Sequence, residues 1–316
     1  MVSVLSLLLY PVPGGLAFLC VRYLLAKFLF KPFGLWFGLR NSKPKQVPPN
    51  LVLEREFSQS KKWDHHKVVG LSKQLDMSQE KIEEWLSLKQ AQVHASVLDK
   101  FCDSAWNFFY YATETTLGFL VLWDKPWLWD TDECWRNFYS QIVTRDVWLY
   151  FMWCLAYGWS QLFGLTFNIK RRDFYIMVIH HVAFITLLTL SGTYDAFRLI
   201  TITIFVCDST DVLLEISKIA KYLGYEKCAF YAFLVFTFWW IVVRVVLFPC
   251  WLAKGFIVDL PRIYPFVTQM WIYYVITILC FVFGVANLIW TYFIVKTLIQ
   301  FCVTGTSKDA RSDCDE

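Results

Sequence analysis

The sequence predicts an all-α membrane protein with about seven transmembrane helices and one small helical insert outside the membrane. Of its 316 residues, 57% are hydrophobic, 19% are aromatic and only 18% are charged, whereas soluble domains carry about 25% charged residues. Long apolar segments alternate with short charged ones, and only the stretch between the first two apolar segments looks soluble. These observations exclude a disordered chain, a coiled coil and a fibrous repeat, and they argue against an ordinary cytosolic enzyme.

The apolar segments have the length of membrane-spanning helices, which need about 20 mostly apolar residues. The first is interrupted by two prolines and two glycines between residues 11 and 15, so it is either a cleaved signal peptide or an uncleaved anchor. Its apolar continuation to Lys27 favours the anchor. The predicted spans are residues 3–26, 104–123, 146–167, 174–193, 197–214, 229–252 and 268–296.

The distribution of lysine and arginine predicts the orientation, because basic residues collect in cytoplasmic loops. Basic clusters follow the first, third and fifth spans, whereas the loop after the second span is acidic. This alternation places the N-terminus in the lumen or outside and the C-terminus in the cytosol. The predicted units are an N-terminal anchor (1–35), a cytosolic insert (36–98), a helical membrane domain (99–303) and an acidic cytosolic tail (304–316).

The insert shows the pattern of two short helices joined by a turn. Ser78 is a candidate N-cap, and the hydrophobic residues on either side of it repeat with helical spacing, namely Val68, Leu71, Leu75, Ile82, Trp85 and Leu86. The pair resembles the last two helices of a homeodomain. However, the second helix carries more acidic than basic residues between Gln79 and Lys89. That charge has the wrong sign for DNA, which favours a structural or regulatory module over a DNA reader.

Ionisable residues inside the spans are candidate functional groups, because burying a charge in the bilayer is costly. His180 and His181 lie in the fourth span, and Asp208, Asp211 and Glu215 share one face of the helix at the fifth span. Counted from the nearest cytosolic base, His180 lies about 12 Å deep and Asp208 about 15 Å deep, at 1.5 Å per residue. The sequence therefore predicts that the two groups meet at one level in the cytosolic half of the membrane.

Three kinds of site remain open for this cluster. A metal site needs three or more ligands, and only two histidines lie in the spans. General-base or nucleophilic catalysis needs one imidazole and a carboxylate that stabilises it, and the cluster supplies both. A structural polar network that ties two helices together is the third interpretation.

Several sequence motifs together resemble the ceramide synthases, the longevity-assurance branch of the TLC-domain proteins. The segment at 169–222 contains IKRRDFYIMVIHHVAFITLLTLSG and DSTDVLLEISKIAKY, which match the family's histidine pair, its serine near the end of that span and its Asp-x-x-Asp-x-x-Leu-Glu-x-x-Lys pattern. Further matches are FCDSAWNFFYY at 101–111, KPWLWDTDECWRNF at 125–138, RVVLFPCW at 244–251, IWTY at 289–292 and the SKDARSD tail. The likeness covers nearly the whole chain.

This resemblance implies a fold and a reaction. The last six spans would form the TLC-domain bundle, and a degenerate homeodomain-like insert belongs to most animal members. The reaction would transfer the acyl group of a fatty acyl-CoA to the 2-amino group of a sphingoid base, giving ceramide or dihydroceramide and free CoA. No metal, other cofactor or nucleic acid is expected. The implied location is the endoplasmic reticulum membrane, and family members resemble dimers.

The resemblance also implies roles for the buried polar residues. His180 would either deprotonate the amine or take the acyl group as an acyl-imidazole, and His181 would orient it or bind substrate. Asp208 and Asp211 would hold imidazolium charge and steer the ammonium group. The expected substrate-binding residues are Ser191, Cys207, Glu215, Arg244 and Asn287.

For several of these residues, the sequence leaves two roles possible. Cys207 and Asn287 stand where the family usually has histidine, and Cys207 is either a reactive thiol or a packing residue. Arg244 would pair with a carboxylate across the bundle or bind a polar substrate group. Glu215 is either structural or paired with Lys218.

Two other functions compete with the acyltransferase. One is a non-catalytic TLC-domain protein that senses lipid or associates with the translocon, which the loss of the family histidine at position 207 favours. The other is a DNA- or partner-binding regulator that works through the insert. In the tail, Ser312 precedes acidic residues and is either a phosphorylation site or part of a solvated terminus.

Overall fold

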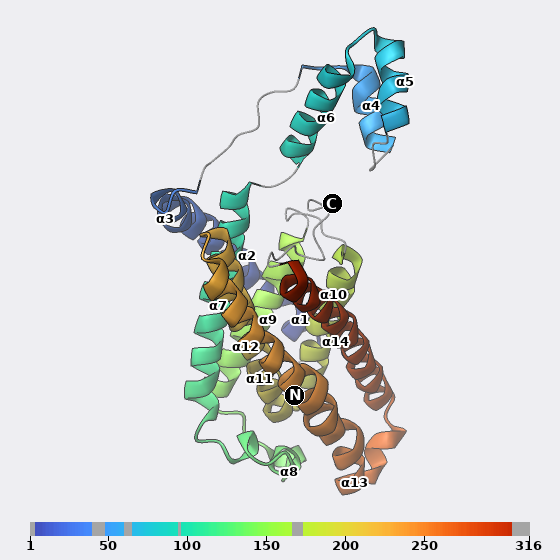
Figure 1. Cartoon of the computed structure of the whole chain (residues 1–316). Coiled ribbons are helices and arrows are strands. Elements are labelled where there is room, and N and C mark those ends of the chain that lie inside the picture. Colours follow the sequence, from blue (N-terminus) through green and yellow to red (C-terminus); the bar gives the residue numbers. More distant parts are fainter. Residues whose placement is uncertain (1–3, 40–47, 60–64, 94–95, 166–172, 305–316) are drawn as a thin grey trace.

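Helices make up the structure, which is a computed structural model that describes residues 4–39, 48–59, 65–93, 96–165 and 173–304 (Figure 1). Within these ranges no strand is present. Among the described residues, four helical segments are long and apolar enough to cross a membrane, as expected of a multi-pass membrane protein: Val4–Trp36, Phe174–Thr193, Glu226–Ile263 and Trp271–Val303.

The N-terminal helical segment runs through α1 (Val4–Leu9), α2 (Pro11–Leu25), one π-helical turn and α3 (Lys31–Trp36). Pro11 is the first residue of α2, where its missing N–H has no partner to lose. The adjacent glycines let α2 pack closely on α9 (Arg145–Gly164), since a Cβ on Gly15 would lie 2.9 Å from the Cβ of Trp159. The predicted anchor is therefore a packed part of the bundle.

The remaining long helices are α7 (Val97–Leu122), α9, α10 (Phe174–Thr193), α11 (Phe197–Tyr222), α12 (Glu226–Trp240) and α14 (Trp271–Thr304). Helix α10 begins and ends where the sequence predicts. Helix α7 begins seven residues before its predicted span because Ser96 caps it, accepting a hydrogen bond from the backbone N–H of Asp99 (3.1 Å). Helix α11 continues beyond residue 214, with its polar last turns at the mouth of a cavity.

Helices α7, α9 and α11 are not among the four most apolar segments. Acidic side chains interrupt α7 and α11, and α9 is rich in tryptophan and tyrosine. They nevertheless pack against the apolar helices around one large core, whose completely buried side chains include Phe151, Leu155, Leu188 and Ile202.

A π-helical stretch, Ile241–Ala253, continues α12 and holds the internal residue Pro249. Proline lacks an N–H and crowds the preceding turn, which breaks regular α-helical bonding. Such π-helical segments are frequent at functional sites, and this one carries Arg244.

Short elements close the end of the bundle that lies opposite the insert, around α8 (Asp132–Trp135) and α13 (Leu260–Ile263) (Figure 1). The indole N–H of Trp135 donates to the carbonyl of Gly255 (2.9 Å), and the guanidinium of Arg198 donates to the carbonyl of Glu133 (2.8 Å). These bonds join segments that are far apart in the sequence.

The insert contains the predicted helix pair, α5 (His65–Leu75) and α6 (Gln79–Val93). Ser78 caps α6, since its hydroxyl accepts from the N–H of Lys81 (3.4 Å). A further helix, α4 (Leu51–Gln59), was not predicted, and its Leu53 is completely buried against the pair. The insert thus has a small hydrophobic core of its own, formed by three helices.

Candidate functional site

A cavity of about 340 Å³ runs along the inside of the bundle. It is lined by side chains of α7, α9, α10, α11, α12, the following π-helical stretch and α14, together with Arg22 of α2. Its volume falls within the range of pockets that bury small ligands, about 300–1,000 Å³. The polar side chains gather midway along the cavity and at one end, and apolar side chains such as Leu188, Ile200 and Phe248 line the other end.

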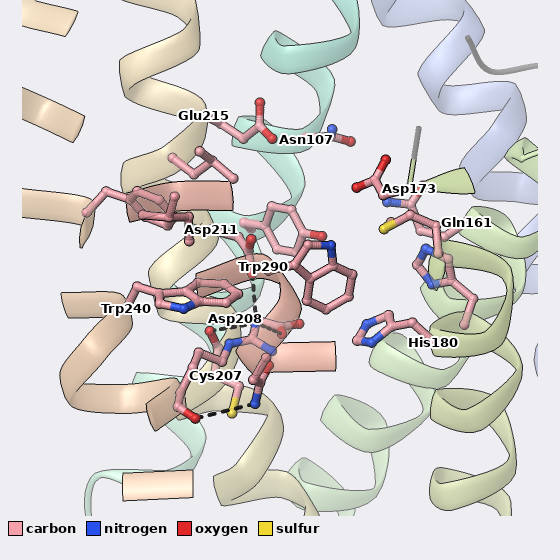
Figure 2. A pocket seen from close by; sticks show the side chains of 18 of the residues that line it. Asn107, Gln161, Asp173, His180, Cys207, Asp208, Asp211, Glu215, Trp240 and Trp290 are labelled. Atoms are coloured by element: carbon pink, nitrogen blue, oxygen red, sulfur yellow. Dashed lines mark hydrogen bonds and ion pairs between the residues drawn. The ribbon is translucent and has the colours of Figure 1, made fainter. Parts of the chain in front are cut away.

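His180 projects into this cavity from α10 (Figure 2). Its ring is packed edge-on by Phe283 and Trp290 of α14, with ring centroids 5.1 and 5.0 Å away, and by His181 at 5.3 Å. The Nδ1 atom of His180 is buried and has no hydrogen-bond partner among the described residues. The imidazole is therefore held in place by aromatic contacts while a nitrogen remains available.

Two carboxylates and one guanidinium form an ionic cluster on the other side of the cavity. Arg244 Nη2 lies 2.9 Å from Asp211 Oδ2 and 3.7 Å from Asp208 Oδ1, and it donates to the backbone carbonyl of Cys207 (3.1 Å). Figure 2 shows His180 on one side and Asp208 and Asp211 on the other, with Trp290 between them. The histidine and the carboxylates thus line one cavity.

Several buried polar atoms of residues that line this cavity lack hydrogen-bond partners in the described part of the chain. They include His180 Nδ1, Arg244 Nε, Asn287 Oδ1 and Trp290 Nε1. Buried polar groups in proteins are nearly always paired. Unpaired atoms that converge on a cavity indicate that a polar ligand group completes the site.

The structure brings most of the predicted site residues to this cavity: His180, His181, Cys207, Asp208, Asp211, Glu215, Arg244 and Asn287 line it. Of the two pairings open for Arg244, it makes the one with carboxylates across the bundle. Glu215 pairs with Lys218, whose Nζ lies 2.7 Å from Oε1. Cys207 is buried within the hydrophobic core.

Ser191 does not line the cavity. It lies eleven residues beyond His180, which is about 16 Å along α10, and its carbonyl accepts the N–H of Ala196 at the turn into α11. Its place in the structure is that of a helix-end residue rather than a cavity residue. Ser312 lies outside the described residues.

Charged and polar side chains line the end of the cavity nearest the insert. Arg22 of α2 pairs with Asp103 of α7 (2.9 Å), and Lys218 and Lys221 project from the last turns of α11. The first helix therefore contributes to the wall of the cavity, which the sequence did not indicate.

Glu114 is a second group that sequence reasoning missed. It is the only charged residue within the predicted span 104–123, so its isolation in apolar sequence was an available signal. Its side chain is completely buried in α7, where the hydroxyl of Tyr150 donates to Oε1.

No group of three or more histidine, cysteine, aspartate or glutamate side chains with the arrangement of a metal site occurs in the ranges that the structure describes. The polar residues of the cavity have the composition of a proton-transfer or group-transfer site, since an imidazole and carboxylates line the same cavity.

Comparison with known proteins identifies the family. The family model for the TLC domain matches residues 100–296. Ceramide synthase 5 of Mus musculus is 34% identical over 305 residues, which is 96% of this chain and 73% of the mouse protein. Ceramide synthase 5 of Homo sapiens is 32% identical over 308 residues, 97% of this chain and 77% of the human protein. Ceramide synthase 3 of Mus musculus is 31% identical over 304 residues, with 96% and 78% coverage.

The chain therefore belongs to the TLC-domain family, in the group of its ceramide synthases. The matched domain contains the histidine pair, the carboxylates and Arg244, whereas Arg22 lies before it.

Proposed function

We propose that this chain is a ceramide synthase that transfers the acyl group of a fatty acyl-CoA to the amino group of a sphingoid base. The observation that carries the proposal is the set of unpaired polar atoms around a cavity that holds a histidine opposite two carboxylates. The names of the relatives, which match almost the whole chain, agree with this reaction.

The shape and polarity of the cavity suit the two substrates. Both carry a long alkyl chain, and the cavity has an apolar end lined by Leu188, Ile200 and Phe248. CoA is a large anionic group, and the opposite end carries Arg22, Lys218 and Lys221. We place the charged end at the cytosolic face, in agreement with the basic loops.

The carboxylates provide a site for the ammonium group of the sphingoid base. Asp211 is the closer partner of Arg244, whereas Asp208 lies 3.7 Å from the guanidinium, beyond hydrogen-bond distance. Asp208 is therefore the carboxylate with acceptor capacity left for an ammonium ion. Such an ion would lie between Asp208 and His180.

The ammonium nitrogen first loses one proton to water. The resulting amine then forms the N–C bond to the acyl carbonyl carbon and loses a second proton, and the CoA thiolate leaves as the C–S bond breaks. His180 can act as the base that accepts this proton and later donates it to the thiolate. Alternatively, His180 attacks the thioester and forms an acyl-imidazole, which the amine then opens. His181 would orient the reacting imidazole in both routes.

A purely structural role for the polar cluster fits the structure less well. A structural network satisfies its own polar atoms, whereas His180, Asn287 and Trp290 each leave one unpaired. The similarity to ceramide synthases also does not favour a non-catalytic lipid sensor.

The proposal includes the arrangement in the membrane. We propose seven spans, with α7, α9 and α11 added to the four most apolar segments because they pack among them. The N-terminus would be lumenal, the insert and the C-terminus cytosolic, and the membrane that of the endoplasmic reticulum. We keep the boundaries 1–35, 36–98, 99–303 and 304–316 for the four units, and a dimer with itself or a related synthase as the assembly.

The test uses the full chain in lipid nanodiscs with sphinganine and a panel of acyl-CoA chain lengths. N-acylsphinganine measured by mass spectrometry is expected for at least one chain length, with equimolar release of free CoA. Absence of product from every acyl-CoA would refute the proposal. Intact-protein mass after incubation with acyl-CoA alone separates the two routes, because only the acyl-imidazole adds an acyl group to the enzyme.

A further inference from the structure

Asn287 carries a buried amide group in α14. The residue is only 3% exposed, and it lines the cavity. Its Nδ2 atom donates to the backbone carbonyl of Arg244 (3.4 Å), whereas Oδ1 has no hydrogen-bond partner among the described residues. Because a carbonyl oxygen can only accept, this contact turns the amide nitrogen toward Arg244 and leaves Oδ1 as a free acceptor. An unpaired buried acceptor is costly, so Asn287 is a candidate for binding a donor group of a ligand.

The contacts of its neighbours place Asn287 at the proposed reaction centre. Phe283 and Trp290 pack edge-on against the ring of His180, with ring centroids 5.1 and 5.0 Å away. They lie four residues before and three residues after Asn287, a spacing that puts all three side chains on one face of α14. Asn287 also contacts Arg244, whose guanidinium belongs to the ionic cluster. The amide is therefore next to the place where we put the amino group of the sphingoid base.

The chemistry of the unpaired atoms favours a hydroxyl group as the ligand. The acceptor Asn287 Oδ1 needs a donor, and the nearby atom Arg244 Nε is a buried donor without a hydrogen-bond partner in the described part of the chain. A thioester carbonyl only accepts and an ammonium group only donates, whereas a hydroxyl group does both. The ammonium group also has a charged partner, Asp208, which binds it more strongly than a neutral amide would.

The sphingoid base supplies such a group at the right place. Sphinganine carries one hydroxyl on each of the two carbons that flank its amine carbon. The hydroxyl groups of CoA, by contrast, are many bonds away from the thioester. An acceptor beside the amino group therefore matches the sphingoid base rather than the acyl donor.

We propose that Asn287 is a specificity-determining residue for the sphingoid base, whose Oδ1 accepts a hydrogen bond from a hydroxyl group on a carbon next to the amine carbon. The inference rests on the proposed function. With its ammonium group at Asp208 and this hydroxyl group at Asn287, the base is held by two neighbouring polar groups, which orients its nitrogen toward His180. An amine without the hydroxyl group leaves the buried Oδ1 unpaired and is therefore a poorer substrate.

The experiment compares two amines in the wild type and in Asn287→Leu, in which leucine has a similar size but no acceptor. The amines are sphinganine and octadecan-2-amine, which has the same carbon chain and neither hydroxyl. The wild type should prefer sphinganine in kcat/KM by about tenfold to hundredfold, the effect of leaving one buried group unpaired. Asn287→Leu should use sphinganine more slowly and reduce this preference to less than about threefold, because neither amine leaves an unpaired acceptor in the variant.

Two further amines identify the hydroxyl group that Asn287 binds. In 1-deoxysphinganine the hydroxyl on the first carbon is missing, and in 2-aminooctadecan-1-ol the one on the third carbon is missing. In the wild type, the amine that lacks the bound hydroxyl should be as poor a substrate as octadecan-2-amine. The other should be close to sphinganine.

Thr291→Val is the matched control on the same helix, one turn beyond Asn287. The hydroxyl of Thr291 accepts from the indole N–H of Trp240 (2.9 Å) and donates to the backbone carbonyl of Asn287 (2.7 Å), so its partners belong to the protein. Valine removes this polar group and leaves the Asn287 side chain in place. The preference for sphinganine should stay at its wild-type value in Thr291→Val, since a general disturbance of α14 slows both amines alike.

A binding measurement gives the same comparison without turnover and covers a variant that has lost activity. The dissociation constants of the two amines are measured in nanodiscs from the change in tryptophan fluorescence, because Trp240 and Trp290 line the cavity. The wild type should bind sphinganine more tightly, and Asn287→Leu should bind both amines about equally.

The outcomes distinguish this inference from the function on which it rests. Equal use and equal binding of the two amines by the wild type would refute the inference and leave the acyltransferase intact. An unchanged preference for sphinganine in Asn287→Leu would refute it as well, since the residue would then act on the amine or on packing. A wild type that binds sphinganine with the expected preference but forms no product would refute the proposed function and support the hydroxyl contact.

Discussion

The ionic cluster of Arg244, Asp208 and Asp211 should stabilise the bundle measurably, and Arg244→Met tests this. Methionine keeps much of the side-chain length and removes the guanidinium. The side chains are 10% exposed for Arg244 and 19% exposed for each aspartate, so water can solvate the abandoned carboxylates only in part. Breaking a buried ion pair costs about 3–5 kcal/mol because it leaves an uncompensated charge.

This cost converts into a melting-temperature shift. For a domain of about 200 residues, each kcal/mol corresponds to about 2–4 °C, so Arg244→Met should lower the melting temperature by about 6–20 °C. The assay is thermal unfolding in lipid nanodiscs, followed by intrinsic tryptophan fluorescence.

A second substitution tests whether the broken ion pair causes the loss of melting temperature. Arg244→Met/Asp211→Asn also removes the charge of the carboxylate closer to Arg244, which would otherwise stay buried without a partner. If the lost ion pair rather than changed packing destabilises the bundle, this double variant should regain about half of the lost melting temperature. A shift below 2 °C for Arg244→Met, or no recovery in the double variant, would show that the cluster does not hold the helices together.

Three further predictions concern other parts of the molecule. Gly15→Val should destabilise the contact between α2 and α9, lowering the melting temperature of the bundle, because its Cβ would meet the backbone carbonyl of Ala156 at 3.0 Å; an unchanged value would refute that close packing. Leu53→Ala should lower the free energy of unfolding of the insert by about 2–5 kcal/mol. We expect faster proteolysis of residues 48–93 with acyl transfer unchanged. Loss of acyl transfer in a protein whose bundle is still folded would contradict the interpretation that the insert folds separately. Burial raises the pKa of the Cys134 thiol well above its usual range, so it stays protonated at pH 8 and should resist iodoacetamide until the protein unfolds, whereas rapid alkylation of the folded protein would show that the closed end of the bundle is open.

The position of the site could be predicted from the sequence because depth in a membrane helix follows from residue counting. Eight residues from Arg172 to His180 and ten from Asp208 to Lys218 placed both groups at similar depth, and the structure brings them to one cavity. The same counting could not say that Arg244 lies with the aspartates. Arg244 lies in a π-helical stretch that contains Pro249, and the hydrophobic pattern of the sequence does not predict which way such a stretch directs its side chains.

The parts that sequence reasoning missed depend on contacts between distant segments. Helix α4 has only a short apolar pattern, and Leu53 is buried by α5 and α6 rather than by its own helix. Arg22 falls within the predicted anchor, and nothing in its own segment indicates its partner Asp103, 81 residues away. Glu114 did carry a local signal, its isolation in an apolar span, but its hydrogen-bond partner Tyr150 comes from another helix.

The central claim is that acyl transfer takes place at His180, and comparison of two histidine variants tests it most directly. The initial rate of N-acylsphinganine formation is measured in nanodiscs for the wild type, for His180→Ala and for His66→Ala, whose histidine is exposed on α5 outside the bundle. We predict a loss of at least about a hundredfold in His180→Ala, as expected for removal of a catalytic base or nucleophile, and wild-type rates in His66→Ala. Equal rates in all three proteins, with His180→Ala folded, would contradict the account.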